Sequence, residues 1–307
     1  MTKHTELFSE LFREIESDLG TREMSLLVME ALINSIDTFK YNDREDFLTQ
    51  FSELVDIISN TEPKFGVLNY NFAGLLHIFS DRLKGVSGKD LKKKSIKYIR
   101  DIIGSCIGEE NKLIINAEKI NVDGKTILIH DHSHTVQDVL SHFKKVGRKF
   151  KVIIAEQDYD KTHSNIEKMH NLGVPFQVVP AYMLSHLHDT IDMAFFGAVT
   201  LKDTMHFVMD PGTHGIISEL LMAQIPVHMF IETKKFSLWR SKARGEIFIH
   251  KHIRKHLFKP IEYERIKYSH DRAEVKLFTK IVTDSGVFNP NELKKFFEQK
   301  LAKELIS

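Results

Sequence analysis

The sequence lacks most of the features that would place it in a membrane, a secretory compartment or a disulfide-stapled fold. It has one cysteine, Cys106, so no intramolecular disulfide can form, and a reducing compartment fits this composition. No apolar run approaches the ~18 residues that a membrane-spanning helix needs. The amino terminus also lacks the apolar core of a signal peptide. We therefore expect a cytoplasmic protein with no membrane partner.

The sequence also lacks an excess of charge of either sign. Lys and Arg number 43 against 42 Asp and Glu, which gives a net charge of +1. Global charge alone would therefore not hold nucleic acid or an anionic membrane. With 307 residues, of which 42% are hydrophobic, the chain is long enough for a large core in one or two domains.

Common nucleotide-binding and hydrolase motifs are missing as well. The triplet 124–126 (Gly-Lys-Thr) looks like the end of a phosphate-binding loop, but Lys119 stands where its first glycine should be, and the triplet precedes a strand. No glycine-rich dinucleotide fingerprint follows a strand, and no Gly-x-Ser-x-Gly elbow occurs. We therefore expect no bound cofactor.

The hydrophobic pattern divides the chain near residue 121. Before this point the apolar residues recur with a helical period, which predicts an all-helical domain over 1–121 with helices near 7–19, 26–36, 47–58, 65–83 and 89–117. Asn42 or Asp43 is a plausible N-cap of the third helix. Cys106 lies among isoleucines of the last helix, which favours a small core residue over a reactive thiol.

After Gly124 short apolar runs alternate with helical patterns, which predicts an α/β domain over 122–307 with a doubly wound, mostly parallel, Rossmann-like sheet. The expected strands are 126–130, 150–155, 176–179, 191–196, 226–231 and 275–283. Ligands of such sheets bind at the carboxyl ends of the strands. That edge carries residues 130–133, 156–158, 197–199 and 232–233.

A basic segment, 234–272, interrupts this alternation. It contains 12 Lys and Arg against four Asp and Glu, an excess of 12 − 4 = 8 positive charges. The segment has no recognised nucleic-acid recognition motif or stacking platform, so we expect either a surface for an acidic partner or a solvated excursion.

Two further stretches carry candidate chemistry. The string 130–134 (His-Asp-His-Ser-His) contains metal-ligand residue types, and His130, Asp131, Asp210 and His214 could form a metal site. The alternative is a hydrogen-bonded histidine at a strand end, which we favour. Gly212 and Thr213 lead into a helix with Thr213 as its expected N-cap. This turn is either a helix cap and nothing more, or a site where the free amides beyond the cap attract a phosphate or carboxylate.

The order of several short motifs resembles the translation initiation factor 2B alpha/beta/delta family over almost the whole chain. This family includes regulatory subunits of a guanine-nucleotide exchange factor, ribose-1,5-bisphosphate isomerase and methylthioribose-1-phosphate isomerase. The resemblance rests on 20–24 (GTREM), 29–32 (MEAL), 127–130 (ILIH), Ser133, 155–156 (AE), 173–175 (GVP), Asp192 with Gly197 and Ala198, Gly212 with Thr213, Pro226 with Glu232, Lys235 and Phe236, and 283–287 (TDSGV).

The departures from the family pattern bear on catalysis. The resemblance implies a catalytic cysteine where Asp131 stands and a catalytic aspartate where Val199 stands. It also implies a lysine at Asp210 and an arginine at Asp158, both of which would favour phosphate. Valine cannot transfer a proton, and two carboxylates repel a phosphate dianion.

We therefore expect a non-catalytic, regulatory-subunit-like protein with a degenerate sugar-phosphate pocket. Its partners would be a second copy or paralogous subunits, bound through the carboxy-terminal domain. The alternative is an aldose–ketose isomerase of the ribose-1,5-bisphosphate isomerase type, with Asp131 and Asp210 as candidate catalytic residues. In either case a phosphorylated sugar or a nucleotide would be the ligand, and we expect contacts from His130, Asp131, Ser133, Glu156, Gly197, Ala198, Gly212, Thr213 and Lys235.

Overall fold

The computed structural model describes residues 3–36, 38–61, 65–237, 247–255, 260–268 and 270–304. The chain forms two compact units, of which the first comprises residues 1–112 with 232–235 and the second 113–231 with 236–307. The boundary falls inside one helix, and four residues from late in the chain belong to the first unit. We keep 1–121 and 122–307 as a proposal for the domain division of the chain.

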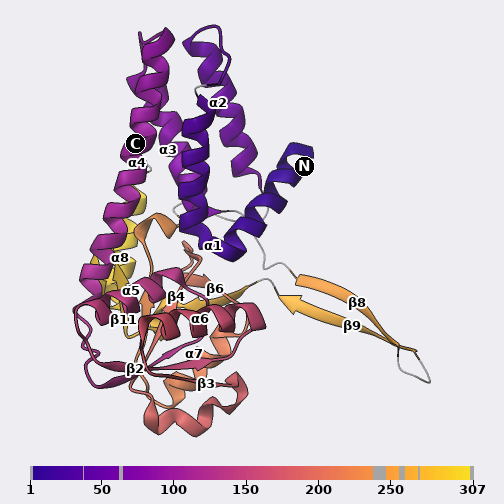
Figure 1. Cartoon of the computed structure of the whole chain (residues 1–307), viewed down its shortest axis with the longest axis vertical. Helices are drawn as coiled ribbons and strands as arrows, with labels where there is room; N and C mark the ends of the chain where they lie inside the picture. Colours follow the sequence, from indigo (N-terminus) through magenta and orange to yellow (C-terminus); the bar gives the residue numbers. More distant parts are fainter. Residues whose placement is uncertain are drawn as a thin grey trace. The chain divides into compact units, whose positions relative to one another are not determined.

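The first unit is a bundle of long helices (Figure 1). Its helices are α1 (Lys3–Ile36), α2 (Arg44–Ser59), α3 (Gly66–Arg82) and the greater part of α4 (Gly88–Ala117). Gly20 has φ 78° and ψ 166°, which breaks α1 into the two helices that the sequence predicts. Asp43 caps α2 by accepting a hydrogen bond from the Asp46 amide, as expected.

Buried aromatic rings fill the centre of the bundle. Phe51 packs against Phe72 and Phe79 with ring centroids 6.1 and 4.8 Å apart, and Phe47 joins them from the same face of α2. Cys106 is buried in this core, so the expectation of a small core residue is confirmed. No helix among the described residues is long and apolar enough to cross a membrane.

The second unit is built on a seven-stranded sheet in the order β12-β11-β7-β4-β1-β2-β3. Every neighbouring pair is parallel except β11 and β12. The mostly parallel α/β fold is therefore confirmed. Its strands are β1 (Lys125–Ile129), β2 (Phe150–Ala155), β3 (Phe176–Val179), β4 (Met193–Gly197), β7 (Val227–Phe230), β11 (Lys280–Thr283) and β12 (Gly286–Phe288).

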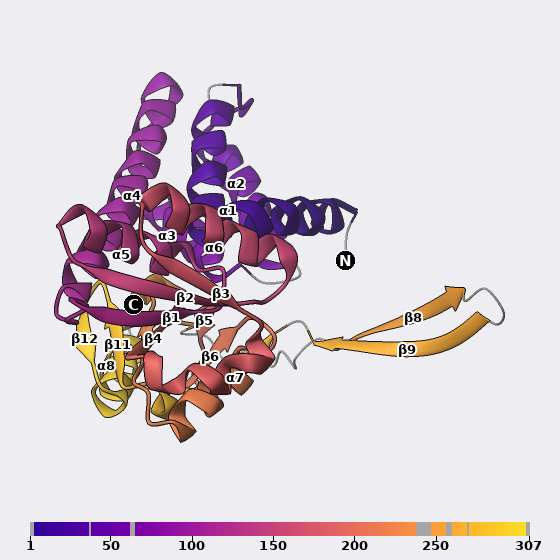
Figure 2. The same cartoon turned by 60° about the horizontal axis from the view of Figure 1, so that its bottom comes forward.

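Alternate residues of the central strands enter two separate cores. Ile127 and Ile129 face a cluster with α5 (His134–Lys145) and α6 (Tyr159–Leu172), whereas Leu128 faces α7 (Thr213–Met222) and α8 (Pro290–Glu304). Figure 2 shows these two helix layers on opposite faces of the sheet. Successive side chains of a strand point to opposite faces of the sheet, and both faces are covered by helices. The central strands are therefore apolar throughout.

Several elements escaped the sequence analysis. In the second unit they are a three-stranded sheet of β5 (Thr200–Leu201), β6 (His206–Met209) and β10 (Asp271–Glu274), and the antiparallel hairpin of β8 (Ile247–Lys255) and β9 (Pro260–Tyr268). In the first unit the short helix η2 (Thr233–Lys235) was missed. The helical pattern after β3 forms the short helix η1 (Ala181–Thr190). The strand expected over 275–283 was wrong in its first part, which forms the short helix η3 (Val275–Leu277) ahead of β11. The hairpin occupies much of the basic segment 234–272, within which 238–246, 256–259 and 269 lie outside the described residues. Lys234, counted in that segment, is buried in the helical unit and pairs with Glu109.

Candidate functional site

The strand order places the candidate site between β1 and β4. From β1 the chain winds outward through β2 and β3 in one direction and through β4 and β7 in the other. In such sheets this reversal opens a crevice at the carboxyl ends of the two central strands. His130 and Asp131 follow β1, and Gly197 ends β4, so the fold brings these three predicted residues to one place.

Asp131 lies in this crevice and binds the neighbouring strand. Its side chain is 6% exposed, and its Oδ2 accepts a hydrogen bond from the Gly197 amide at 3.1 Å. Burial, together with the nearby charge of Asp210, raises the pKa of Asp131 to about 8. Its other oxygen, Oδ1, is buried and has no hydrogen-bond partner among the described residues. The carboxyl group is therefore mostly protonated at neutral pH.

Ser133 and Gly197 leave no room for a side chain between them. A Cβ atom at Gly197 would lie 2.0 Å from Ser133 Oγ and 2.6 Å from Ser133 Cβ. Ser133 is itself fixed, because its Oγ accepts the Val136 amide and caps α5. The start of α5 is thus in direct contact with the end of β4, and protein atoms fill this part of the crevice.

His130 is a hydrogen-bonded strand-end residue, as the favoured alternative predicts. Its Nδ1 donates to the carbonyl of Ala155 at 3.1 Å, and since a carbonyl only accepts, the lone pair lies on Nε2. Nε2 is buried without a partner among the described residues. Burial lowers the pKa of His130, which keeps the ring neutral.

The two acids at the positions expected to be basic are both used in structural contacts. Asp210 follows β6 and forms an ion pair with Lys161 of α6 at 2.7 Å. Asp158 caps α6, because its Oδ1 accepts the Lys161 amide at 3.0 Å. Glu156, at the end of β2, is exposed, and its amide donates to Val179.

The amino terminus of α7 differs from the prediction. The N-cap is Gly212, which has φ 95° and makes no side-chain cap, so Thr213 as the cap residue was wrong. Instead the Asp271 carboxylate of β10 accepts the amides of Gly212 at 2.9 Å and His214 at 3.0 Å. The anion at this helix end is therefore one of the protein's own carboxylates.

The remaining predicted residues are placed as follows. Ala198 directly follows β4 and is half-buried, and Val199 after it is exposed. Lys235 lies in η2, in the helical unit, and its amide donates to Glu232. Across the described ranges, no group of three or more His, Cys, Asp or Glu is arranged to hold a metal ion. The hypothesis of a His130, Asp131, Asp210 and His214 site therefore has no geometric support.

Two residues that shape the site were missed. Lys161 stands three residues after Asp158 in an ordinary helix, and Asp271 lies 57 residues from the His214 amide that it binds. Neither has a local sequence signal, because their contacts depend on the packing of separate elements.

A comparison with protein families shows which family the chain belongs to. The model of the Initiation factor 2 subunit family matches residues 18–290. The chain belongs to this family. The predicted resemblance is therefore confirmed at the level of the family.

Among curated members, the chain is 26% identical over 122 residues to translation initiation factor eIF2B subunit alpha of Dictyostelium discoideum, which covers 39% of this chain and 38% of that protein. It is 30% identical over 154 residues to the delta subunit of Schizosaccharomyces pombe, covering 49% of this chain and 32% of that protein. The matched regions thus span about a third of each of these curated relatives.

Solved structures of initiation factor 2B proteins share the fold across most of the chain. The tetrameric eIF2B-beta2-delta2 complex of C. thermophilum contains a chain with a TM-score of 0.72 and 16% identity, covering 94% of this chain and 93% of that chain. The Pyrococcus horikoshii OT3 translation initiation factor eIF-2B has a TM-score of 0.65 and 18% identity, covering 94% and 98%.

Within this initiation factor 2 family chain, the crevice between β1 and β4 has a distinct chemistry. A buried neutral carboxyl and a neutral imidazole lie side by side in sequence there, and the charges of Asp210 and Asp158 are committed to α6. Among the described residues, the cation near these acids is Lys161, and its ammonium group is already paired with the Asp210 carboxylate.

Proposed function

We propose that the chain is a non-catalytic, regulatory-type subunit of the initiation factor 2B kind, which works by binding a second copy or a paralogous subunit through its sheet-containing unit. The observation that carries the proposal is Asp131. Its carboxyl occupies the crevice that would hold a sugar phosphate and bonds the Gly197 amide that such a ligand would use. A phosphate dianion there would meet a protonated carboxyl at neutral pH and a repelling carboxylate above the pKa of Asp131, about 8.

Catalysis of an aldose–ketose isomerisation requires an acid and a base that act on adjacent carbons. Asp131 could serve as one of them, but the neighbouring candidate, Asp210, is held by Lys161 at 2.7 Å. Val199 after the end of β4 cannot transfer a proton. These features favour the subunit over the isomerase.

Partner binding is supported by the exposed apolar side chains of η1 and α7. Tyr182 and Met222 are 86% and 88% exposed, and the His188–Glu219 pair at 3.0 Å links the two elements. The solved tetrameric complex contains a chain with the same fold. We therefore infer that this surface takes part in pairing, in the cytoplasmic setting that the sequence predicts.

The test is the mass of the whole chain by light scattering at micromolar concentration in 500 mM NaCl, where surface ion pairs are screened. We expect at least a dimer, and we expect Tyr182→Ser combined with Met222→Ser to shift it toward the monomer. Tyr159→Ser, which removes an equally exposed tyrosine from α6, is the matched control. A strict monomer would overturn the proposal.

The absence of catalysis is tested separately. Ribose phosphates at millimolar concentration should leave the melting temperature unchanged, because a ligand that does not bind the native state cannot stabilise it. Interconversion of such compounds at an enzyme-like rate, abolished by Asp131→Ala, would replace this proposal with the isomerase alternative.

A further inference from the structure

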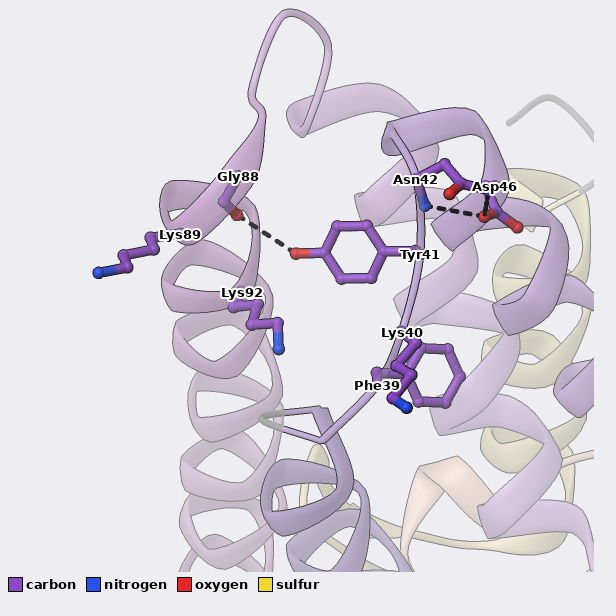
Figure 3. Close-up of a pocket in the computed structure, with 8 residues that line it drawn as sticks. All are labelled: Phe39, Lys40, Tyr41, Asn42, Asp46, Gly88, Lys89 and Lys92. Carbon is purple, nitrogen blue, oxygen red and sulfur yellow. Dashed lines mark hydrogen bonds between the residues drawn. The ribbon is translucent and has the colours of Figure 1, made fainter.

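The helical unit has a surface hollow of about 820 Å³ where the loop after α1 faces the start of α4 (Figure 3). Lys40, Lys89 and Lys92 contribute to its lining. The one acid there, Asp46, is already used, because its carboxylate accepts hydrogen bonds from the amide and side chain of Asn42 and from Gln50. With three lysines against this one carboxylate, the lining keeps an excess of positive charge.

The positive charge continues along α4 beyond the hollow. Lys89, Lys93 and Lys97 recur every four residues and are exposed, and Arg100 follows them one turn later. Four residues of helix rise about 6 Å, so these cations form a row on one face. Among the described residues none of the four is joined to an acidic group by an ion pair. We call Lys40, Lys89, Lys92, Lys93, Lys97 and Arg100 the α4 basic surface.

The aromatic ring in the hollow is already engaged. The Tyr41 hydroxyl donates to the Gly88 carbonyl at 3.2 Å, and its ring meets Phe47 edge-on at 5.3 Å. Lys92 Nζ lies 5.8 Å from the ring centroid (Figure 3). Since a nucleic-acid base would need an open ring face for stacking, the α4 basic surface favours an acidic polypeptide over a single-stranded nucleic acid.

The chain itself carries an acidic row with the same spacing. In the amino half of α1, Glu6, Glu10 and Glu14 recur every four residues and are exposed. Beside them Leu7 and Leu11 are 62% and 45% exposed. We call these five residues the α1 acidic stripe.

The amino half of α1 is held in the bundle by its other face. Thr5, Ser9 and Phe12 are buried, and the Phe12 ring contacts Phe65 edge-on at 5.8 Å. Because α1 breaks at Gly20, its amino half leads away from α2, α3 and α4 (Figure 1). The break thus leaves an acidic and apolar helix face open to solvent.

We propose that the α1 acidic stripe of one copy docks on the α4 basic surface of a second copy, and that the contact is reciprocal. Two copies related by a twofold axis make this contact twice, which closes the assembly. The rows match in spacing and are opposite in charge, and the leucines supply apolar area that ion pairs alone lack. This pairing uses the helical unit and is separate from the sheet-mediated pairing proposed above.

Charge reversal in the full-length chain tests the contact. Lys93→Glu with Lys97→Glu, and separately Glu6→Lys with Glu10→Lys, should each weaken association at 50 mM NaCl by at least about tenfold in Kd, measured by analytical ultracentrifugation. An equimolar mixture of the two variants should associate again, because each α1 then meets an α4 of opposite charge. Lys294→Glu with Lys295→Glu, an equal charge change on exposed residues of α8, should leave the mass unchanged.

The outcomes separate this contact from the sheet-mediated one. If both contacts exist, charge reversal halves the mass and leaves the sheet-mediated dimer. If only the α1–α4 contact exists, charge reversal converts a dimer into a monomer. An unchanged mass in both charge-reversal variants would overturn the α1–α4 contact. So would a mixture that fails to associate, or single-stranded RNA binding that is lost with Lys93 and Lys97 while the mass stays constant.

Discussion

The two units of this chain bury ionisable groups in opposite ways. In the helical unit each buried charge has a counter-charge: Arg22 contacts Glu110 and lies 3.6 Å from Glu232, and Lys234 binds Glu109 at 2.9 Å. Burial disfavours the charged guanidinium, yet the carboxylates of Glu232 and Glu110 outweigh it and raise the pKa of Arg22. The guanidinium of Arg22 therefore stays charged.

In the sheet unit the buried acid has no cation in contact. Asp131 accepts one backbone amide, and the nearest acid, Asp210, adds repulsion while Lys161 pairs with Asp210. The buried cation of the helical unit is thus compensated by carboxylates, whereas the buried acid of the sheet unit has no cation in contact. We therefore expect Arg22 to keep its charge, whereas the crevice between β1 and β4 should respond to pH near the pKa of Asp131, about 8.

The largest expected effect concerns the contact between β4 and α5 in the sheet unit. Gly197→Ala places a methyl group within 2.0 Å of Ser133 Oγ, so the end of β4 and the start of α5 must separate. We expect a loss of more than about 4 kcal/mol in the free energy of unfolding, measured by urea titration with circular dichroism. Ser133→Gly in the same chain should restore part of it.

The matched control for this change is Gly104→Ala in α4. No atom lies within 4 Å of the added methyl group there, and alanine favours a helix. This variant should be as stable as the wild type or slightly more so. A Gly197→Ala protein of wild-type stability would mean that the crevice is not closed by Ser133.

The second largest effect concerns the buried ion pairs of Arg22 in the helical unit. Arg22→Met removes the cation that faces Glu110 and Glu232, and we expect a cost of about 3–5 kcal/mol in the free energy of unfolding. Arg148→Met, which breaks the half-exposed pair with Asp123, should cost less than about 1 kcal/mol. Equal losses in the two variants would show that burial of the Arg22 cluster has no special weight.

The third change sharpens the difference in pH response. The pKa of Asp131 in the native state, about 8, lies above the ordinary value of 3.8, so between these two pH values the native state holds a proton that the unfolded chain has lost. Stability therefore falls as pH rises through this range, and Asp131→Asn removes the fall. The variant should gain several degrees in Tm at pH 9 relative to wild type and little at pH 4.

Asp192→Asn is the control of opposite sign. The Lys125 side chain and then the Thr126 amide lower the pKa of Asp192, so its charge stabilises the native state above the unfolded pKa. Its loss should lower Tm at pH 7 and have less effect at pH 3. If both variants shift Tm in the same direction at every pH, the assigned ionisation states are wrong.

The smallest effect concerns the start of α7. Asp271→Ala deprives the amides of Gly212 and His214 of their acceptor, and we expect a loss of about 1 kcal/mol in the free energy of unfolding. Asp189→Ala, at an exposed position in η1, should cost almost nothing. Equal values would indicate that water replaces the cap without loss.

The sequence predicts the elements whose signals are local. The helical period over 89–117 and the five-residue apolar runs of β1 and β4 need only neighbouring residues, and Gly20 marks the break in α1. The position of His130 and Asp131 in the crevice follows from the rule that ligands bind at the carboxyl ends of parallel strands. Contacts between these residues and a ligand stay a prediction.

The remainder depended on contacts between distant segments. β5 has two residues, too few for a period, and the charge of 234–272 obscured the alternation of the β8–β9 hairpin. Thr213 was chosen as the cap of α7 by residue type, but Asp271 reaches that position only after the hairpin returns the chain as β10.

Residues 232–235 have a consequence for any attempt to divide the molecule. They follow β7 in the chain, yet Glu232, Thr233 and Lys234 are buried as part of the helical unit. A fragment ending at residue 112 would keep Glu110 but lack the Glu232 carboxylate near Arg22, and it would lack the Lys234 ammonium group 3.2 Å from the Cys106 sulfur. A truncated chain that stops before residue 232 would therefore form an incomplete bundle, and during synthesis the bundle can be completed only after residue 235 has been made.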